Sequence, residues 1–129
     1  MRKYVMFILT LMLITSCANL NRERSSFEMC MDCLHYNYFD KAIIYCKKAT
    51  VEDTNNYHGF YFLSLAYYMQ HDSSKALESI DKAILIKPDD YALWNHKAKL
   101  LKDYGKDYES SVCHKKAYEL ELKEKNEGK

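Results

Sequence analysis

Glycine and proline are scarce in this chain, which has three glycines and one proline among 129 residues. An all-β domain of this size needs a turn residue about every 8 to 12 positions. Gly59, Gly105, Gly128 and Pro88 are too few to supply those turns. The shortage therefore excludes a β-sandwich or a β-barrel and favours a helical protein.

An excess of one charge is also lacking, because 19 Lys and Arg residues oppose 18 Asp and Glu residues, for a formal net charge of +1. Proteins that bind the phosphates of nucleic acids need a basic surface, so we expect no nucleic-acid partner. The sequence contains no glycine-rich phosphate loop and no pair of carboxylates that stands apart from ordinary charged helix faces. We therefore expect a protein that is not an enzyme and has no catalytic residue and no cofactor.

The one long hydrophobic run is too short to cross a bilayer. Arg2 and Lys3 precede an apolar stretch over residues 4–14, whereas a spanning helix needs about 20 apolar residues. A basic start followed by a short apolar stretch is typical of a secretory signal peptide. We therefore expect residues 1–16 to be a signal peptide.

The end of this segment resembles the lipobox of bacterial lipoproteins. Residues 14–17 read Ile-Thr-Ser-Cys, which gives an aliphatic residue, two small residues and the cysteine. The resemblance implies lipidation of Cys17, cleavage before it, and a linker that completes residues 17–22. It also implies an anchor in the cell envelope, and Ala18 favours the outer membrane, facing the periplasm, by the enterobacterial sorting rule. An ordinary secretory peptide or an uncleaved anchor is the alternative.

The rest of the chain repeats with a period of 34 residues. Ala49, Ala83 and Ala117 form one column of this repeat. Five further columns share the register, including Ala42, Ala76 and Ser110; Cys46, Ile80 and His114; and Asn37, His71 and Gly105. Such a period is the signature of a repeat architecture. The sequence therefore predicts three units, over residues 23–56, 57–90 and 91–124, followed by a charged tail at 125–129.

The middle unit resembles the tetratricopeptide repeat. Its matching residues, at positions 4, 7, 8, 11, 20, 24, 27 and 32 of the unit, are Phe60, Leu63, Ser64, Tyr67, Ala76, Ile80, Ala83 and Pro88. The resemblance implies an all-α superhelix of three helix-turn-helix units. In the third unit Lys97, Ser110 and His114 depart from the pattern, so we expect looser packing there.

The spacing of the apolar residues supports two helices in each unit. Phe60, Leu63 and Tyr67 recur every three or four residues, which gives a helix one apolar stripe. Small residues at positions 8, 20 and 27 allow two antiparallel helices to approach closely. Asn37 and Gly105 tolerate the left-handed conformation that ends a helix. Asp89 or Asp90 is expected to cap the helix that follows Pro88.

By resemblance to the family, a concave groove is formed by the first helix of each unit. The residues at its groove positions are Phe27, Met31, Leu34 and His35; His58, Tyr61, Leu65, Tyr68 and Met69; and Asn95, Lys99 and Lys102. One end of this groove is apolar and the other is basic, which suits a peptide with hydrophobic anchors and an acidic end. Alternatively, the apolar residues are covered by the protein's own ends or by a second copy.

The cysteines after Cys17 leave two interpretations open. Positions 8 and 24 of a hairpin face each other, so Cys30 and Cys46 are a candidate disulfide pair, which an exported location permits. The alternative is that they are buried thiols. The Cys30-x-x-Cys33 spacing lies inside a predicted helix, where neither thiolate activation nor a zinc knuckle is expected. We therefore expect no metal site, and surface positions for the five histidines.

These observations predict a membrane-anchored adaptor of the bacterial cell envelope that binds protein partners. Small lipoproteins of this kind resemble accessory factors for the assembly of pilus secretins or outer-membrane complexes. A structural homo-oligomer that buries its own groove or helix ends is the alternative from a different class. A thiol redox or metal-binding protein is a third hypothesis, which depends on the cysteines alone.

Overall fold

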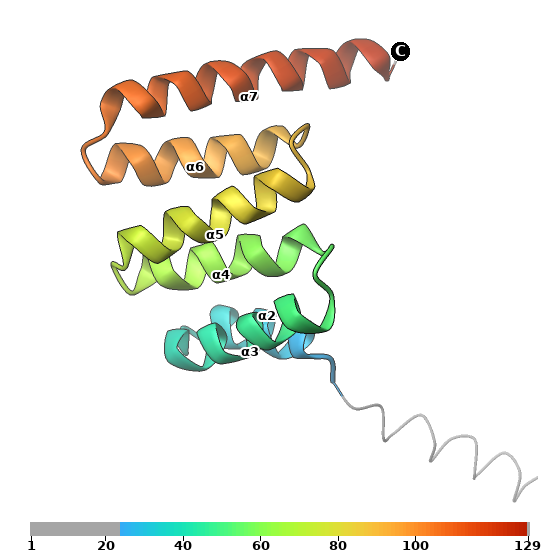
Figure 1. Ribbon diagram of the computed structural model, residues 1–129, viewed down its shortest axis with the longest axis vertical. Coiled ribbons are helices and arrows are strands. Elements are labelled where there is room, and N and C mark those ends of the chain that lie inside the picture. Colours follow the sequence, from blue (N-terminus) through green and yellow to red (C-terminus); the bar gives the residue numbers. More distant parts are fainter. Residues whose placement is uncertain (1–23, 129) are drawn as a thin grey trace, which may run out of the picture.

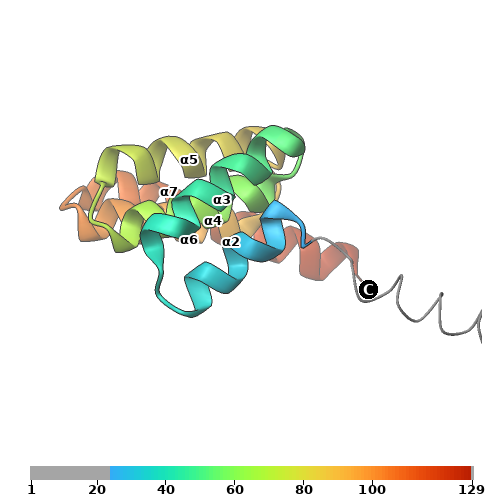
Figure 2. The same cartoon turned by 90° about the horizontal axis from the view of Figure 1, so that it is seen from below.

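The computed structural model describes residues 24–128, which form six α-helices in three antiparallel pairs (Figure 1). The helices are α2 (Ser26–His35), α3 (Phe39–Glu52), α4 (Tyr57–Met69), α5 (Ser73–Ile86), α6 (Tyr91–Asp103) and α7 (Asp107–Glu127). The pairs α2/α3, α4/α5 and α6/α7 stack on one another in chain order. Seen from below, α2 lies on one side of the stack, and α3 and α5 lie on the other (Figure 2). This part of the chain is an all-α helical-repeat solenoid.

The turn inside each pair has a residue in the left-handed conformation. Asn37 and His71 have φ of 60° and Gly105 has φ of 74°. The amide that follows each of them donates to a carbonyl five residues earlier: Tyr38 to Cys33 at 2.8 Å, Asp72 to Tyr67 at 3.0 Å and Lys106 to Leu101 at 2.8 Å. This is the Schellman pattern, which ends one helix and reverses the chain. The three equivalent turns recur at the 34-residue spacing of the sequence repeat.

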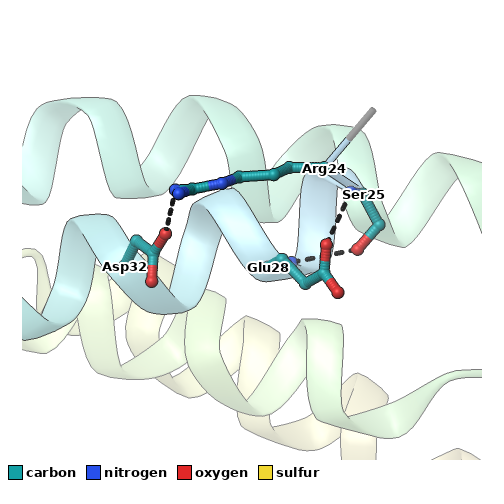
Figure 3. A network of polar contacts seen from close by, with 4 residues as sticks. All are labelled: Arg24, Ser25, Glu28 and Asp32. Atoms are coloured by element: carbon teal, nitrogen blue, oxygen red, sulfur yellow. Dashed lines mark hydrogen bonds and ion pairs between the residues drawn. The ribbon is translucent and has the colours of Figure 1, made fainter. Parts of the chain in front are cut away.

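Polar side chains begin most of the helices. At α2, the Ser25 hydroxyl accepts from the Glu28 amide at 3.1 Å, and the Glu28 carboxylate accepts from the Ser25 amide at 3.0 Å (Figure 3). Arg24 extends along the same helix to an ion pair with Asp32 at 2.7 Å. Asn56, Asp72 and Asp90 cap α4, α5 and α6. Each cap satisfies an amide that the first turn of a helix leaves unpaired.

Small residues lie where the two helices of each pair cross. Positions 8, 20 and 27 are all buried, and their residues are Cys30, Ala42 and Ala49; Ser64, Ala76 and Ala83; and Ala98, Ser110 and Ala117. Larger side chains, among them Leu63, Tyr67 and Ile80, fill the space beside the crossings in one continuous core. This arrangement is the close packing that the alanine columns predict.

The third unit packs more closely at Ser110 than its sequence suggests. We expected looser packing there, because Ser110 replaces the alanine of the other units. Instead, the Ser110 hydroxyl is buried and donates to the Ala98 carbonyl across the crossing at 2.7 Å. A hydroxyl with a partner takes the place of a methyl group without leaving a polar atom unsatisfied.

The described residues begin and end at the same edge of the stack. The start of α2, the end of α7, and the loops at 53–56 and 87–90 lie along one edge in Figure 1, and the turns at Asn37, His71 and Gly105 lie along the opposite edge. The last helix is longer than its equivalents, with 21 residues against 14 in α3 and in α5. It continues past residue 124, so most of the predicted charged tail is helical.

Candidate functional site

The first helices of the three pairs lie side by side and form the surface that we call the α2–α4–α6 face. The Phe27 ring of α2 lies 5.6 Å from the Phe62 ring of α4. In the same way, the Tyr61 ring of α4 lies 5.0 Å from the ring of His96 on α6. Aromatic rings therefore fill both junctions between the helices of this face.

The apolar end of the face lies on α2 and α4. Met31 and Met69 are 44% and 42% exposed, although each is a large apolar side chain. Leu34 and Leu65 are half-buried, and Leu34 packs against the core. Exposed methionine is polarisable and adapts to the shape of an apolar partner. The two methionines are therefore the apolar groups most available for binding on this face.

A half-buried histidine of α6 lies between the helices of this face. The Nε2 atom of His96 lies 3.2 Å from the Ser64 hydroxyl, which itself donates to the Ala76 carbonyl at 2.8 Å. Because the single hydroxyl hydrogen of Ser64 points to the Ala76 carbonyl, the Ser64 oxygen accepts a hydrogen bond from His96, whose Nε2 carries a hydrogen. Burial, with the charge of Lys99 nearby, lowers the pKa of His96 from 6.5 to about 4. His96 is therefore neutral at pH 7.

This serine–histidine contact does not form a nucleophilic site. Ser64 is completely buried, so no substrate can reach its hydroxyl. Its proton is also held by a backbone carbonyl rather than directed toward His96. The pair therefore joins α4, α5 and α6 and has no features of catalytic geometry.

The basic end of the face combines lysines with a tyrosine–aspartate pair. Tyr68 donates to the Asp103 carboxylate at 2.6 Å, and this hydrogen bond, with burial and the same negative charge, raises the pKa of Tyr68. The Lys99 ammonium lies 5.4 Å from the centre of the Tyr68 ring. Lys99 and Lys102 are exposed. Asp103 offsets part of their positive charge, because the three groups share one end of α6.

A pocket of about 520 Å³ opens beside this end. It is lined by Tyr68, Met69, His71, Ser73, Asp103 and Tyr104. The hydroxyl of Tyr104 is buried without a hydrogen-bond partner, and this burial, with the charges of Asp103 and Asp72, raises the pKa of Tyr104. The pocket adds a recess of mixed polar and apolar lining to the predicted groove, next to the exposed side chain of Met69.

The other predicted groove residues lie in different surroundings. His35 and His58 are exposed, and His58 stacks near Tyr57 and Phe27. Asn95 faces α7, because its side-chain oxygen lies 3.3 Å from the Nδ1 atom of His114. Tyr61 and Tyr68 pack partly against the core. The apolar and basic groups thus lie on one face, and Asn95 lies at its border with α7.

Sequence reasoning missed His96, Asp103 and Tyr104. It placed all five histidines at the surface, which is wrong for His96, although the other four are exposed. Ser64 and His96 are 32 residues apart, so their contact does not follow the 34-residue register. One signal was available. His96 follows the groove position Asn95, and the neighbouring first helix, α4, carries aromatic residues such as Tyr61.

The cysteines of the first pair are joined. Cys30 of α2 and Cys46 of α3 form a disulfide, with their Cα atoms 5.0 Å apart. Cys33 and Cys113 are free and buried. Burial raises the pKa of the Cys113 thiol, which disfavours its reactive thiolate form. Cys30 therefore pairs across the hairpin and not with Cys33, its neighbour in the Cys-x-x-Cys spacing.

No group of three potential metal ligands lies together among residues 24–128. None of the helices in this part of the chain combines the length and the hydrophobicity needed to span a bilayer. The predicted signal peptide and Cys17 lie outside the described residues, so both the cleavage and the lipidation remain predictions.

Comparisons with known proteins identify the fold. The protein prenyltransferase alpha subunit repeat matches residues 73–104, which are α5 and α6. A crystal structure of MamA matches with a TM-score of 0.75 and 24% identity, covering 78% of this chain and 59% of that chain. The translocator chaperone SycD of Yersinia enterocolitica type III secretion matches with a TM-score of 0.71 and 16% identity, covering 74% of this chain and 72% of that chain.

These similarities are structural and remote in sequence. No curated protein sequence matches the chain significantly. The chain spans less than two thirds of the MamA chains that it resembles, 59% of one and 57% of another. The repeat-family match and the matches to solved structures agree on a stack of tetratricopeptide-like helix pairs.

Proposed function

We propose that this chain is a protein-interaction adaptor, tethered to a membrane of the bacterial cell envelope through a lipid on Cys17. Its α2–α4–α6 face binds a peptide or a helix of a partner that takes part in envelope assembly, such as a pilus, secretin or outer-membrane complex. The protein has no catalytic role in this proposal. The similarity to a translocator chaperone supports a function in binding other proteins.

The observation that carries the proposal is the distribution of exposed groups on this face. Met31 and Met69 expose apolar surface, whereas Lys99 and Lys102 expose positive charge at the end of α6. A ligand with apolar anchors and an acidic end would bury the first pair and neutralise the second. Repeat stacks commonly use such an extended face for binding.

A peptide panel tests the chemistry of the face. Twelve-residue peptides with two leucine or phenylalanine anchors and an acidic end should bind the full chain more tightly than matched peptides with a basic end. The double variant Lys99→Glu/Lys102→Glu should reverse that preference by at least about tenfold. The control Lys82→Glu/Lys87→Glu carries the same charge change on α5 and its following loop, and should leave the preference unchanged. Equal effects of both variants would refute the site.

The apolar end is tested separately with Met31→Glu and Met69→Glu. These substitutions are preferable to Tyr61→Ala and Tyr68→Ala, because both tyrosines also pack against the core. Each methionine variant should weaken binding of the acidic-ended peptide while the thermal melt stays unchanged. Leu85→Glu, at an exposed site on α5, is the matched control.

The tether is tested by labelling growing cells with a fatty-acid analogue. The wild-type chain should incorporate the label and fractionate with membranes, and Cys17→Ser should lose the label. Fractionation of inner and outer membranes then assigns the location. A labelled Cys17→Ser chain would contradict the proposed attachment.

A further inference from the structure

The last helix of the stack has an outer face that no helix of residues 24–128 covers. Ser110, Cys113 and Ala117 turn toward α6 and are buried. The residues on the opposite side of α7 are Tyr108, Val112, Lys115, Glu119, Leu122 and Asn126, and we call this set the α7 outer face. Figure 1 shows α7 at the end of the stack, with this side free of other helices.

The spacing of this set is that of a coiled-coil contact. Its residues are separated alternately by four and three positions over nearly the whole helix. Helices with such a heptad pattern pack along one another. Tyr108, Val112 and Leu122 are 80%, 52% and 41% exposed, so the face presents apolar surface that the described residues leave uncovered.

Its central charges show which partner fits. Lys115 and Glu119 are both exposed, and neither forms an ion pair among residues 24–128. In a parallel pair of α7 helices each charge would meet its own kind, which is unfavourable. In an antiparallel pair with a two-fold axis at the level of Ala117, Lys115 lies opposite Glu119 of the second copy. The two-fold axis makes this favourable contact occur two times in the dimer. The charges are therefore complementary only in the antiparallel arrangement.

The apolar residues match in the same register. Val112 lies opposite Leu122 of the second copy, and Tyr108 lies opposite Asn126. A shift of one heptad in either direction places Val112 against Lys115, or Leu122 against Glu119. The self-complementary register is thus unique among those that keep the heptad positions in contact.

We propose that two copies of this chain associate through an antiparallel pairing of their α7 outer faces. The α2–α4–α6 face is formed by other helices, so it stays open in this dimer. On one flank of the contact, Glu109 lies opposite Lys123 of the second copy, which is favourable. On the same flank, Lys116 lies opposite Lys116 of the second copy, which is unfavourable. A two-fold interface of this kind is the commonest form of homo-oligomer.

Disulfide trapping tests the geometry in the full chain, expressed in bacteria. A tagged Val112→Cys chain and a differently tagged Leu122→Cys chain should form a mixed disulfide under mild oxidation. Either variant alone should give little product, because two copies of residue 112 lie about 15 Å apart along the antiparallel helices. Self-crosslinking of Val112→Cys would indicate a parallel pair and overturn the proposal, as would the absence of a mixed product.

Charge reversal tests the proposed register. Lys115→Glu in both chains should lower the yield of the mixed disulfide at least about tenfold, and so should Glu119→Lys in both. Combining a Lys115→Glu chain with a Glu119→Lys chain should restore the yield. Lys116→Glu is the matched control, because it replaces one like-charged contact with another. Circular dichroism checks that each variant is folded, and equal losses in folded Lys115→Glu and Lys116→Glu would overturn the register.

Discussion

The hydroxyl of Ser64 on α4 donates to the backbone carbonyl of Ala76 on α5, 2.8 Å away, at the point where the two helices cross. In the next pair the roles are exchanged, since Ser110 of α7 donates to the Ala98 carbonyl of α6. Both hydroxyls are buried, and both bonds join position 8 to position 20 of a unit. The crossing thus accepts a serine from either helix, provided that the opposite residue is small.

Removal of the Ser64 hydroxyl should destabilise the fold. Ser64→Ala deletes the bond to Ala76 and leaves the Nε2–H of His96 without its acceptor, so we expect a loss of about 1 to 2 kcal/mol. Urea unfolding followed by circular dichroism measures this loss. Ser111→Ala is the control, because its exposed hydroxyl bonds only within its own helix, and it should change stability by less than about 0.5 kcal/mol.

A larger side chain at the crossing should also be unfavourable. Ala76 is completely buried, so Ala76→Leu inserts a bulky group where the helices touch, and should cost about 1 to 3 kcal/mol. The exposed neighbour Ser74 receives the same side chain in the control Ser74→Leu, which should melt like the wild type. A thermal melt that Ala76→Leu leaves unaltered would contradict the packing described for this pair.

The disulfide should stabilise the first pair. A bond across a sequence separation of 16 contributes about 3 kcal/mol by limiting the unfolded chain, so Cys30→Ala/Cys46→Ala should lower stability by about that amount. The control Cys33→Ala makes the same chemical change at a free buried cysteine and should cost less. Alkylation of the denatured, unreduced protein should modify Cys33 and Cys113 and spare the bonded pair. Modification of Cys30 and Cys46 would refute the bond.

His96 should make stability depend on pH. Its pKa is about 4 in the folded protein against 6.5 for the ordinary side chain, so the unfolded chain takes up a proton first as the pH falls. The free energy of unfolding is therefore highest above pH 6.5, where His96 is neutral in both states. It falls by about 3 kcal/mol in total between pH 6.5 and about 4.

The variant His96→Gln should remove most of this dependence. Glutamine still has an N–H for Ser64 but does not titrate, so urea unfolding at pH 7, 5.5 and 4.5 should give a flatter profile than the wild type. The exposed His58 provides the control, since His58→Gln should retain the wild-type slope. An equal slope in His96→Gln would show that other groups cause the acid sensitivity.

The repeating part of the fold could be predicted from the sequence because it depends on residue size. The alanine columns and the three turn residues recur every 34 positions, and the structure places them at equivalent crossings and turns. The contacts between His96 and Ser64, and between Tyr68 and Asp103, could not be predicted in this way. They join residues 32 and 35 positions apart, so they depend on side-chain rotamers that the period does not specify.

The position where α7 ends could not be predicted from the repeat pattern either. The family pattern ends each unit after 34 residues, but no glycine or proline interrupts the chain between Gly105 and Gly128. The backbone therefore stays helical through Glu127, and intrahelical pairs such as Lys125 with Glu121 at 2.7 Å support the last turns.

The helices of residues 24–128 form antiparallel pairs, so each pair starts and ends at the same edge of the stack. With respect to any attachment before Arg24, this edge is the near one and the opposite edge is the far one. The starts and ends of the helix pairs share the edge where the chain enters, and the turns at Asn37, His71 and Gly105 share the other. The pocket beside Met69 and Tyr104 lies at this second edge, next to the turn at His71. One helix length therefore separates it from the point of attachment, and a fusion joined after α7 would occupy the near edge and leave this pocket clear.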